Sequence, residues 1–177
     1  MRAFVAVMLP DAVRTSLESG VQTLRSVEPD LTWEAAERWH LTLTFLGDVD
    51  EGVGIDVAPR LTRAASRTVA FDLSIGGFGR FGRRVLYAKV GGDRAALRRL
   101  SDRTTAAARR AGIEVADERF RPHVTLARSR HGADLRALVA SAPEISAEWT
   151  VTEITLVQSV LGADRRYTVV DTFPLAG

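Results

Sequence analysis

Two of the three histidines in this chain stand in the same short motif. His40 and His123 are each followed, two residues later, by a threonine, Thr42 or Thr125. In a β-strand, such a histidine and threonine project from one face, roughly 7 Å apart. Two imidazoles can serve as general base and general acid, and hydroxyls can hold the oxygens of an anion. The pattern therefore predicts in-line attack on a phosphate held between two His–Thr pairs.

The same histidines admit other interpretations. Each could be a structural histidine with satisfied hydrogen bonds, or the two together could bind a metal ion. No carboxylate cluster accompanies them in the sequence, so a metal is not implied. The third histidine, His131, lies in a segment typical of a loop and has no predicted role.

Arginines surround the second motif. Arg128 follows His123 by five residues and is a candidate phosphate contact. In a regular strand it would point away from His123, so this role requires a β-bulge or a strand end. We interpret Arg121 and Arg130 as surface charges.

An internal repeat with an offset of 83 residues relates the two motifs. The strand predicted at 4–7 then falls on 87–90, and His40 falls on His123. A helix is expected after each of these strands, capped by Asp11 in the first and by Asp93 in the second. Their apolar positions are Val13, Leu17, Val21 and Leu24 in the first, and Leu97, Leu100, Ala107, Ala108 and Ala111 in the second, which ends at Gly112.

The offset continues beyond the histidines. Alternating apolar residues predict a strand at 69–75 with a counterpart at 152–158. A helix is expected over 56–66, starting near Ala58 because Pro59 fits only a first turn, and a shorter one over 134–141. We therefore predict a tandem duplication, roughly 2–84 and 85–167, folded as a single bilobal domain whose lobes share a cleft.

The segment 77–82 matches the pattern G-x-G-x-x-G. A dinucleotide site would need a helix to begin there, but a strand is predicted at 85–88. We predict a flexible loop between two strands instead. Its phenylalanines and Arg80, Arg83 and Arg84 suit a surface for single-stranded RNA, and equally a hairpin loop with solvated arginines.

Composition excludes several classes of protein. The 177 residues are 46% hydrophobic and contain no cysteine, so a globular core is expected, without disulfides, thiolate catalysis or iron–sulfur clusters. Lys89 is the one lysine among 24 cationic residues, an excess of arginine that suits phosphate but also follows from a GC-rich genome. The apolar run 3–9 lacks the cleavage site of a signal peptide, and no stretch could span a membrane. We expect a cytoplasmic protein.

The motifs and their surroundings resemble the two-histidine (2H) phosphoesterase superfamily, and most closely the bacterial and archaeal RNA 2′,3′-cyclic phosphodiesterases, first described as 2′-5′ RNA ligases. The resemblance implies an α+β fold with an antiparallel sheet plus helices in each lobe, and an active-site cleft between the lobes. We expect a monomer. The segments that carry the resemblance are 2–6, 40–47, 77–81, 121–128 and 159–162 with Tyr167.

The resemblance also implies an activity. It implies hydrolysis of RNA 2′,3′-cyclic phosphate ends, or of cyclic nucleotides, to 2′-phosphates, without metal or other cofactor. His40 and His123 would be catalytic, and Thr42, Thr125 and Arg128 would hold the substrate. By the same resemblance, His123 would activate water and His40 would protonate the leaving 3′ oxygen.

Two alternatives stay open beside this activity. The chain could bind RNA or nucleotides without turnover, or the same site could join a cyclic phosphate to a 5′-hydroxyl end. Two departures from many relatives are Thr44, where a lysine is common, and Gly82, where a proline is common. In a regular strand Thr44 shares a face with His40, so we expect it to alter RNA contacts.

Overall fold

The computed structural model describes residues 1–163 and 165–177. These residues form one nine-stranded sheet in the order β7-β4-β5-β6-β3-β1-β8-β9, with β2 paired to β6. In chain order the elements are β1 (Arg2–Met8), α1 (Asp11–Val27), β2 (Thr32–Trp33), the 3-10 helix η1 (Ala36–Arg38), β3 (His40–Asp48), α2 (Glu51–Ser66), β4 (Phe71–Phe81), β5 (Val85–Gly92), α3 (Arg94–Arg110), β6 (His123–Arg128), α4 (Leu135–Ala140), β7 (Ser146–Val151), β8 (Glu153–Val160) and β9 (Arg166–Pro174).

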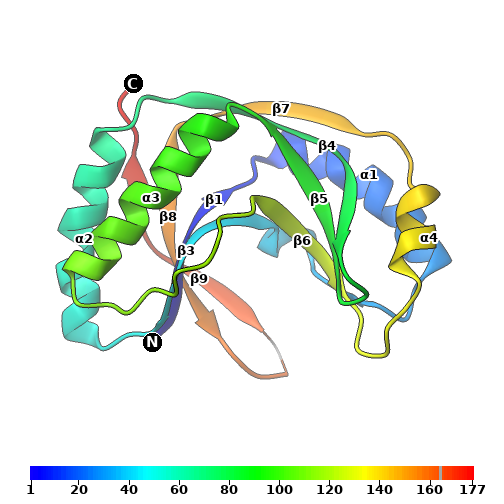
Figure 1. Cartoon of the computed structure of the whole chain (residues 1–177), viewed down its shortest axis with the longest axis horizontal. Coiled ribbons are helices and arrows are strands. Elements are labelled where there is room, and N and C mark those ends of the chain that lie inside the picture. Colours follow the sequence, from blue (N-terminus) through cyan, green and yellow to red (C-terminus); the bar gives the residue numbers. More distant parts are fainter. Residues whose placement is uncertain (164) are drawn as a thin grey trace.

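The sheet has two antiparallel halves that meet where β3 lies beside β6. β1, β8 and β9 continue the sheet beyond β3, and β5, β4 and β7 continue it beyond β6. In Figure 1, α2 and α3 lie at the left over the first half, and α1 and α4 lie at the right over the second. The expected α+β fold is confirmed, with the antiparallel halves joined edge to edge in one curved sheet.

Element bounds recur at the offset of 83 residues. α1 spans 11–27 and α3 spans 94–110, while β3 and β6 begin at His40 and His123. The strands are nevertheless exchanged between the halves: β4 pairs with β5, and β8 pairs with β1. Neither half is therefore built from one repeat, and a tandem duplication remains our proposal.

One hydrophobic core spans both halves. Leu17 of α1, Leu97 of α3, Leu41 of β3 and Leu126 of β6 belong to the same buried cluster. The helices reach it through the apolar stripes expected from their sequences, and the Asp93 carboxylate caps α3 by accepting a hydrogen bond from the Ala96 N–H at 2.9 Å. No helix formed by the described residues is long and apolar enough to cross a membrane.

Two helix starts differ from the predictions. Asp11 is the first residue of α1, with Pro10 in the capping position, and its carboxylate pairs with Arg14 instead of capping the helix. α2 begins at Glu51, seven residues before the predicted start, so Pro59 lies inside it. The Pro59 ring removes the hydrogen bond to the Ile55 carbonyl. Ile55 is 73% exposed, so this part of the helix faces water that can replace the bond.

Two strand predictions also need correction. The segment 77–82 is not a flexible loop, because β4 runs through Phe81 and only a turn at 82–84 separates it from β5. Gly77 has a φ of 82° where the β4–β5 pairing is irregular, and no helix follows, so the dinucleotide pattern carries no such site. Val69 lies outside β4 and is exposed.

Candidate active site

The two His–Thr pairs meet at the junction of the sheet halves. Leu41 of β3 and Val124 of β6 are cross-strand partners, and both are buried. The antiparallel register then sets Thr42 beside His123 and His40 beside Thr125 on the opposite face from these anchors. The structure therefore brings the four residues together across a single pair of strands.

Each histidine ring is oriented by a backbone carbonyl two residues before it. His40 Nδ1 lies 2.7 Å from the Arg38 oxygen, and His123 Nδ1 lies 2.7 Å from the Arg121 oxygen. Since a carbonyl only accepts, Nδ1 carries the hydrogen in both rings. Nε2 is then the atom that gains or loses a proton, and in His40 it lies 3.0 Å from the Thr42 hydroxyl.

Aromatic rings flank both histidines. Phe4 stacks on His40 with ring centres 4.6 Å apart, and Tyr167 meets the same ring edge-on at 5.4 Å. Phe81 and Tyr87 meet His123 edge-on at 4.8 and 5.6 Å. Sequence analysis missed these partners, although Phe4 and Tyr87 stand at the same offset of 83 residues.

Gly79 makes room for one of these rings. It is the cross-strand partner of Tyr87, and a Cβ atom built there would lie 2.5 Å from the Tyr87 ring. Any larger residue would push Tyr87 away from His123. The glycine therefore supports the second histidine rather than a nucleotide phosphate.

A β-bulge turns Arg128 toward the catalytic face. Leu86 pairs with Ala127 and Tyr87 pairs with Thr125, so Leu126 is the extra residue on β6. This bulge supplies the irregularity that a phosphate-binding role for Arg128 requires. The Arg128 charge also contributes to lowering the pKa of His123, which places the two groups near one another.

A second bulge, at the equivalent place in β3, corrects the prediction for Thr44. Val5 pairs with Thr44 and Ala6 pairs with Thr42, so Leu43 is the extra residue. Thr44 consequently points away from His40 and is only 3% exposed, with its hydroxyl 2.8 Å from that of Thr104 in α3. Thr44 therefore packs against α3 at the base of the cleft and does not share a face with His40.

Phe45 takes the place on the catalytic face that was expected of Thr44. It stands at the position equivalent to Arg128, and 68% of its surface is exposed. It lines a cleft of about 520 Å³ together with Thr42, Phe81 and His123. An exposed aromatic ring beside the catalytic residues offers a surface on which a base can stack.

The rim of this cleft carries more charge than the sequence suggested. Arg121, interpreted above as a surface charge, is exposed but lines the cleft, as do Arg119 and Glu118. The three arginines of the β4–β5 hairpin, Arg80, Arg83 and Arg84, are exposed, and none of them lines the cleft. His131 is exposed as well.

A buried carboxylate ties the His40 side of the site together. Glu34 accepts hydrogen bonds at 3.0 Å from Arg38, whose carbonyl orients His40, and from Arg165, which lies close to Tyr167 in the chain. Arg38 also donates to the Arg165 carbonyl at 3.2 Å. Glu34 therefore links the segment before β3 to the start of β9, two places that supply contacts to His40.

The pKa values of the two histidines are shifted in the same direction, but their charged neighbours differ. Burial is the largest cause of a lowered pKa for both His40 and His123. For His40 the negative charge of Glu34 works in the opposite direction, whereas for His123 the Arg128 charge lowers the pKa further. These charges favour a proton on His40 and a neutral His123. Among the described residues, no three histidine, aspartate or glutamate side chains are grouped to hold a metal ion.

The family model and the sequence relatives of this chain point to the same family. Residues 10–163 match the model of the 2′-5′ RNA ligase superfamily. An RNA 2′,3′-cyclic phosphodiesterase of Geobacillus stearothermophilus is 29% identical over 98% of this chain, which spans 57% of that protein's length. An enzyme of the same name from Thermus thermophilus is 32% identical and covers 100% of this chain and 91% of its own.

Solved structures agree with the sequence relatives. The crystal structure of E. coli LigT in apo form has a TM-score of 0.81 and 26% identity, covering 99% of this chain and 98% of LigT. LigT complexed with 3′-AMP is similar, with a TM-score of 0.79 at the same identity and coverage.

Proposed function

The chain belongs to the 2′-5′ RNA ligase superfamily, and on that premise we propose that it hydrolyses 2′,3′-cyclic phosphate ends of RNA to 2′-phosphates. The observation that carries the proposal is the pairing of His40 with Thr125 and of Thr42 with His123 across the β3–β6 junction. The names of the sequence relatives support the same reaction. His40 and His123 are the proposed catalytic residues, and Thr42, Thr125 and Arg128 are the proposed phosphate contacts.

In this mechanism the phosphate sits between the two histidines. Water attacks phosphorus from the side of His123 and gives its proton to Nε2 of that ring. The bond from phosphorus to the 3′ oxygen breaks on the opposite side, and Nε2–H of His40 protonates the leaving oxygen. Thr42, Thr125 and Arg128 stabilise the charge on the non-bridging oxygens. The unequal charges of Glu34 and Arg128 support this division of roles.

The dependence of kcat/KM on pH should be bell-shaped, with its maximum below about 6.5, the ordinary pKa of histidine. Activity in the free enzyme needs one protonated and one neutral histidine, and burial lowers the pKa of both. The bound phosphate anion favours the protonated rings, so the profile of kcat should lie at higher pH. Initial rates across the pH range test both expectations.

Glu34→Gln and Arg128→Gln test which histidine sets each limb of this pH profile. It removes the charge that raises the pKa of His40, so the alkaline limb of kcat/KM should move to lower pH. Arg128→Gln removes a charge that lowers the pKa of His123, so the acid limb should move to higher pH. Movement of the acid limb in Glu34→Gln would show that His40 is not the protonated member of the pair.

Phe45 should contribute to substrate affinity through base stacking. We expect Phe45→Leu to raise KM by about 5- to 160-fold with little change in kcat, because stacking on a ring is worth about 1–3 kcal/mol per base. Phe45→Trp keeps an aromatic face and should stay close to the wild type. Equal losses in both variants would indicate a packing role instead, and thermal unfolding of both variants separates the two cases.

A turnover assay separates hydrolysis from the two alternatives. An RNA with a 2′,3′-cyclic phosphate end is incubated in EDTA with an excess of RNA that carries a 5′-hydroxyl. Hydrolysis predicts that the cyclic phosphate is opened by water to a 2′-phosphate. Ligation predicts a product of higher mass in which the two RNAs are joined. Binding without any loss of the cyclic end would contradict the proposal and favour a binding module.

We also propose that the protein acts as a monomer in the cytoplasm. The cleft is formed by elements of one chain, and the described helices include none that could span a membrane. Sedimentation at the concentration of the activity assay tests the first point, and cell fractionation tests the second.

A further inference from the structure

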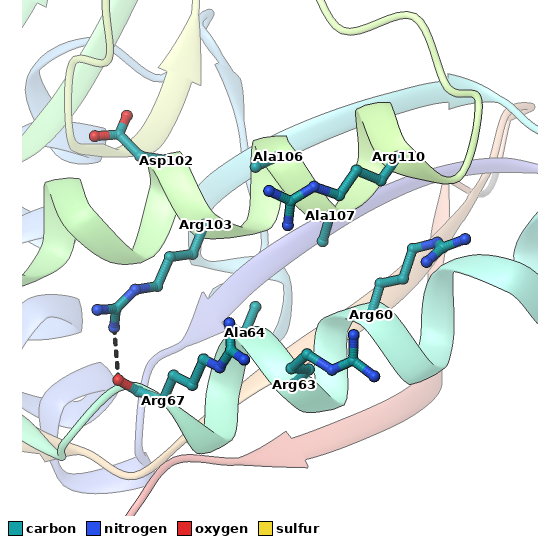
Figure 2. A pocket seen from close by; sticks show the side chains of 9 residues that line it. All are labelled: Arg60, Arg63, Ala64, Arg67, Asp102, Arg103, Ala106, Ala107 and Arg110. Carbon is teal, nitrogen blue, oxygen red and sulfur yellow. Dashed lines mark hydrogen bonds between the residues drawn. The ribbon is translucent and has the colours of Figure 1, made fainter.

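Five arginines line a groove between α2 and α3, away from the histidines. α2 contributes Arg60 and Arg63, Arg67 directly follows its last residue, and α3 contributes Arg103 and Arg110 (Figure 2). The groove has a volume of about 330 Å³, and Ala64, Ala106 and Ala107 complete its lining with small side chains. We call it the arginine groove.

The positive charges in this groove are not compensated. Its lining includes one carboxylate, Asp102, whose side chain points away from α2 in Figure 2. None of the five arginines forms an ion pair with another of the described residues. The Nε atom of Arg60 is shielded from solvent and has no hydrogen-bond partner there. Clustered like charges and a buried donor without an acceptor are both unfavourable, and an anion in the groove would relieve both.

The spacing of the arginines defines the shape of that anion. Arg67 caps the end of α2 seven residues after Arg60, and Arg110 follows Arg103 by seven residues on α3, so each pair spans about 10 Å along its helix. Arg103 is fixed by hydrogen bonds at 2.8 Å to the Arg67 carbonyl and to the Thr68 hydroxyl. An elongated anion with more than one phosphate matches two such rows better than a single small ion.

Helix α3 separates the arginine groove from the catalytic cleft. On its other side, Ser101 donates to the Leu43 carbonyl of β3 at 2.8 Å, and Thr104 contacts Thr44. Ser101 and Thr105 also line the catalytic cleft. A ligand in the groove would therefore not occupy the position of the reacting phosphate.

We propose that the arginine groove is a second binding site that takes consecutive phosphate groups. Two sources offer this chemistry: the backbone of an RNA strand and a free polyphosphate. The proposal does not depend on hydrolysis, because none of the residues that line the groove lines the cleft beside His123.

The test compares two double variants with equal loss of charge. Arg63→Gln with Arg67→Gln alters the groove, whereas Arg98→Gln with Arg99→Gln alters exposed arginines of α3 that do not line it. Binding of a short single-stranded RNA with a 3′-hydroxyl end is measured by fluorescence anisotropy over a range of salt concentrations. The groove variant should bind about 10-fold more weakly and reduce the salt slope by about 1.4, since each of two phosphate contacts on a single strand contributes about 0.7. The control should bind more tightly than the groove variant.

A second titration, with inorganic tripolyphosphate by calorimetry, identifies the source. Weakened RNA binding in the groove variant supports an RNA strand, and weakened tripolyphosphate binding alone supports a free polyphosphate. Equal effects in the two variants, or no effect on either probe, would overturn the proposal. Thermal unfolding tests whether both double variants are folded. Arg110→Gln replaces the groove variant if that variant does not fold. Because the RNA probe has no cyclic end, failure of the proposed hydrolysis would leave this result unaffected.

Discussion

Replacing either histidine of the cleft should lower the rate of cyclic phosphate hydrolysis by about 10²- to 10⁴-fold, the usual contribution of one proton transfer. His123→Ala removes the group that receives the proton of water, and His40→Ala removes the group that protonates the leaving oxygen. The losses in the double variant should be less than the product of the single losses, because the two residues act in one step. Single-turnover rates with a cyclic-phosphate RNA measure all three variants.

Two control variants separate the loss of a catalytic histidine from damage to local packing. His40→Asn retains an N–H that can donate to the Arg38 carbonyl, so it preserves local packing better than alanine while losing the acid. His131→Ala removes the exposed third histidine and should retain full activity. Wild-type rates in His40→Ala or His123→Ala, with the fold intact, would eliminate the two-histidine mechanism.

A substrate with a better leaving group should show which histidine is the general acid and which is the general base. In a substrate whose bridging 3′ oxygen is replaced by sulfur, the leaving group departs as a thiolate and gains little from protonation. His40→Ala should therefore recover about 10²-fold or more of its lost rate on the sulfur substrate. His123→Ala should remain impaired, since water still needs a base. The measurement is the ratio of rates on sulfur and oxygen substrates for each variant.

The wild type and His131→Ala give the reference ratio for that comparison. Recovery in His123→Ala instead of His40→Ala would reverse the two roles. Each ring donates its Nδ1–H to a carbonyl, His40 to that of Arg38 and His123 to that of Arg121, so these bonds do not assign the roles. The charges of Glu34 and Arg128 do distinguish the two histidines. The sulfur substrate thus tests the electrostatic argument directly.

The sequence was sufficient to predict the strands and helices that recur at the offset and the two His–Thr pairs that the structure brings together. Strand alternation and helical periodicity are local properties, so the strands at His40 and His123 and the helix capped by Asp93 could be located without a structure. The offset of 83 residues then related them. The exchange of β4 and β8 between the halves could not be inferred, because strand pairing depends on contacts far apart in the chain.

The β-bulges explain why the predicted orientation of Thr44 was wrong. The extra residue Leu43 changes the face on which the next residues of β3 lie, so Thr44 packs against α3 and Phe45 is exposed at the cleft. The same event at Leu126 turns Arg128 toward His123. Bulges leave little local signal in a sequence, although the requirement for one was evident from the position of Arg128.

Other features arise only when distant elements pack. Tyr167 reaches His40 from the last strand, and Gly79 has meaning only beside the Tyr87 ring. The arginine groove likewise needs α2 and α3 side by side, and the early start of α2 at Glu51 was concealed by Pro59. Local pattern therefore located the candidate catalytic residues, whereas the contacts around them depend on tertiary packing.

The most direct test of the central claim is the chemical identity of the RNA end formed by the wild-type protein. An RNA with a 2′,3′-cyclic phosphate is hydrolysed in ¹⁸O-labelled water with EDTA, and the product end is identified by mass spectrometry and by its sensitivity to phosphatases. Protonation of the 3′ oxygen by the paired-histidine site predicts a 2′-phosphate with one labelled oxygen. A 3′-phosphate, or an unchanged cyclic end, would contradict it.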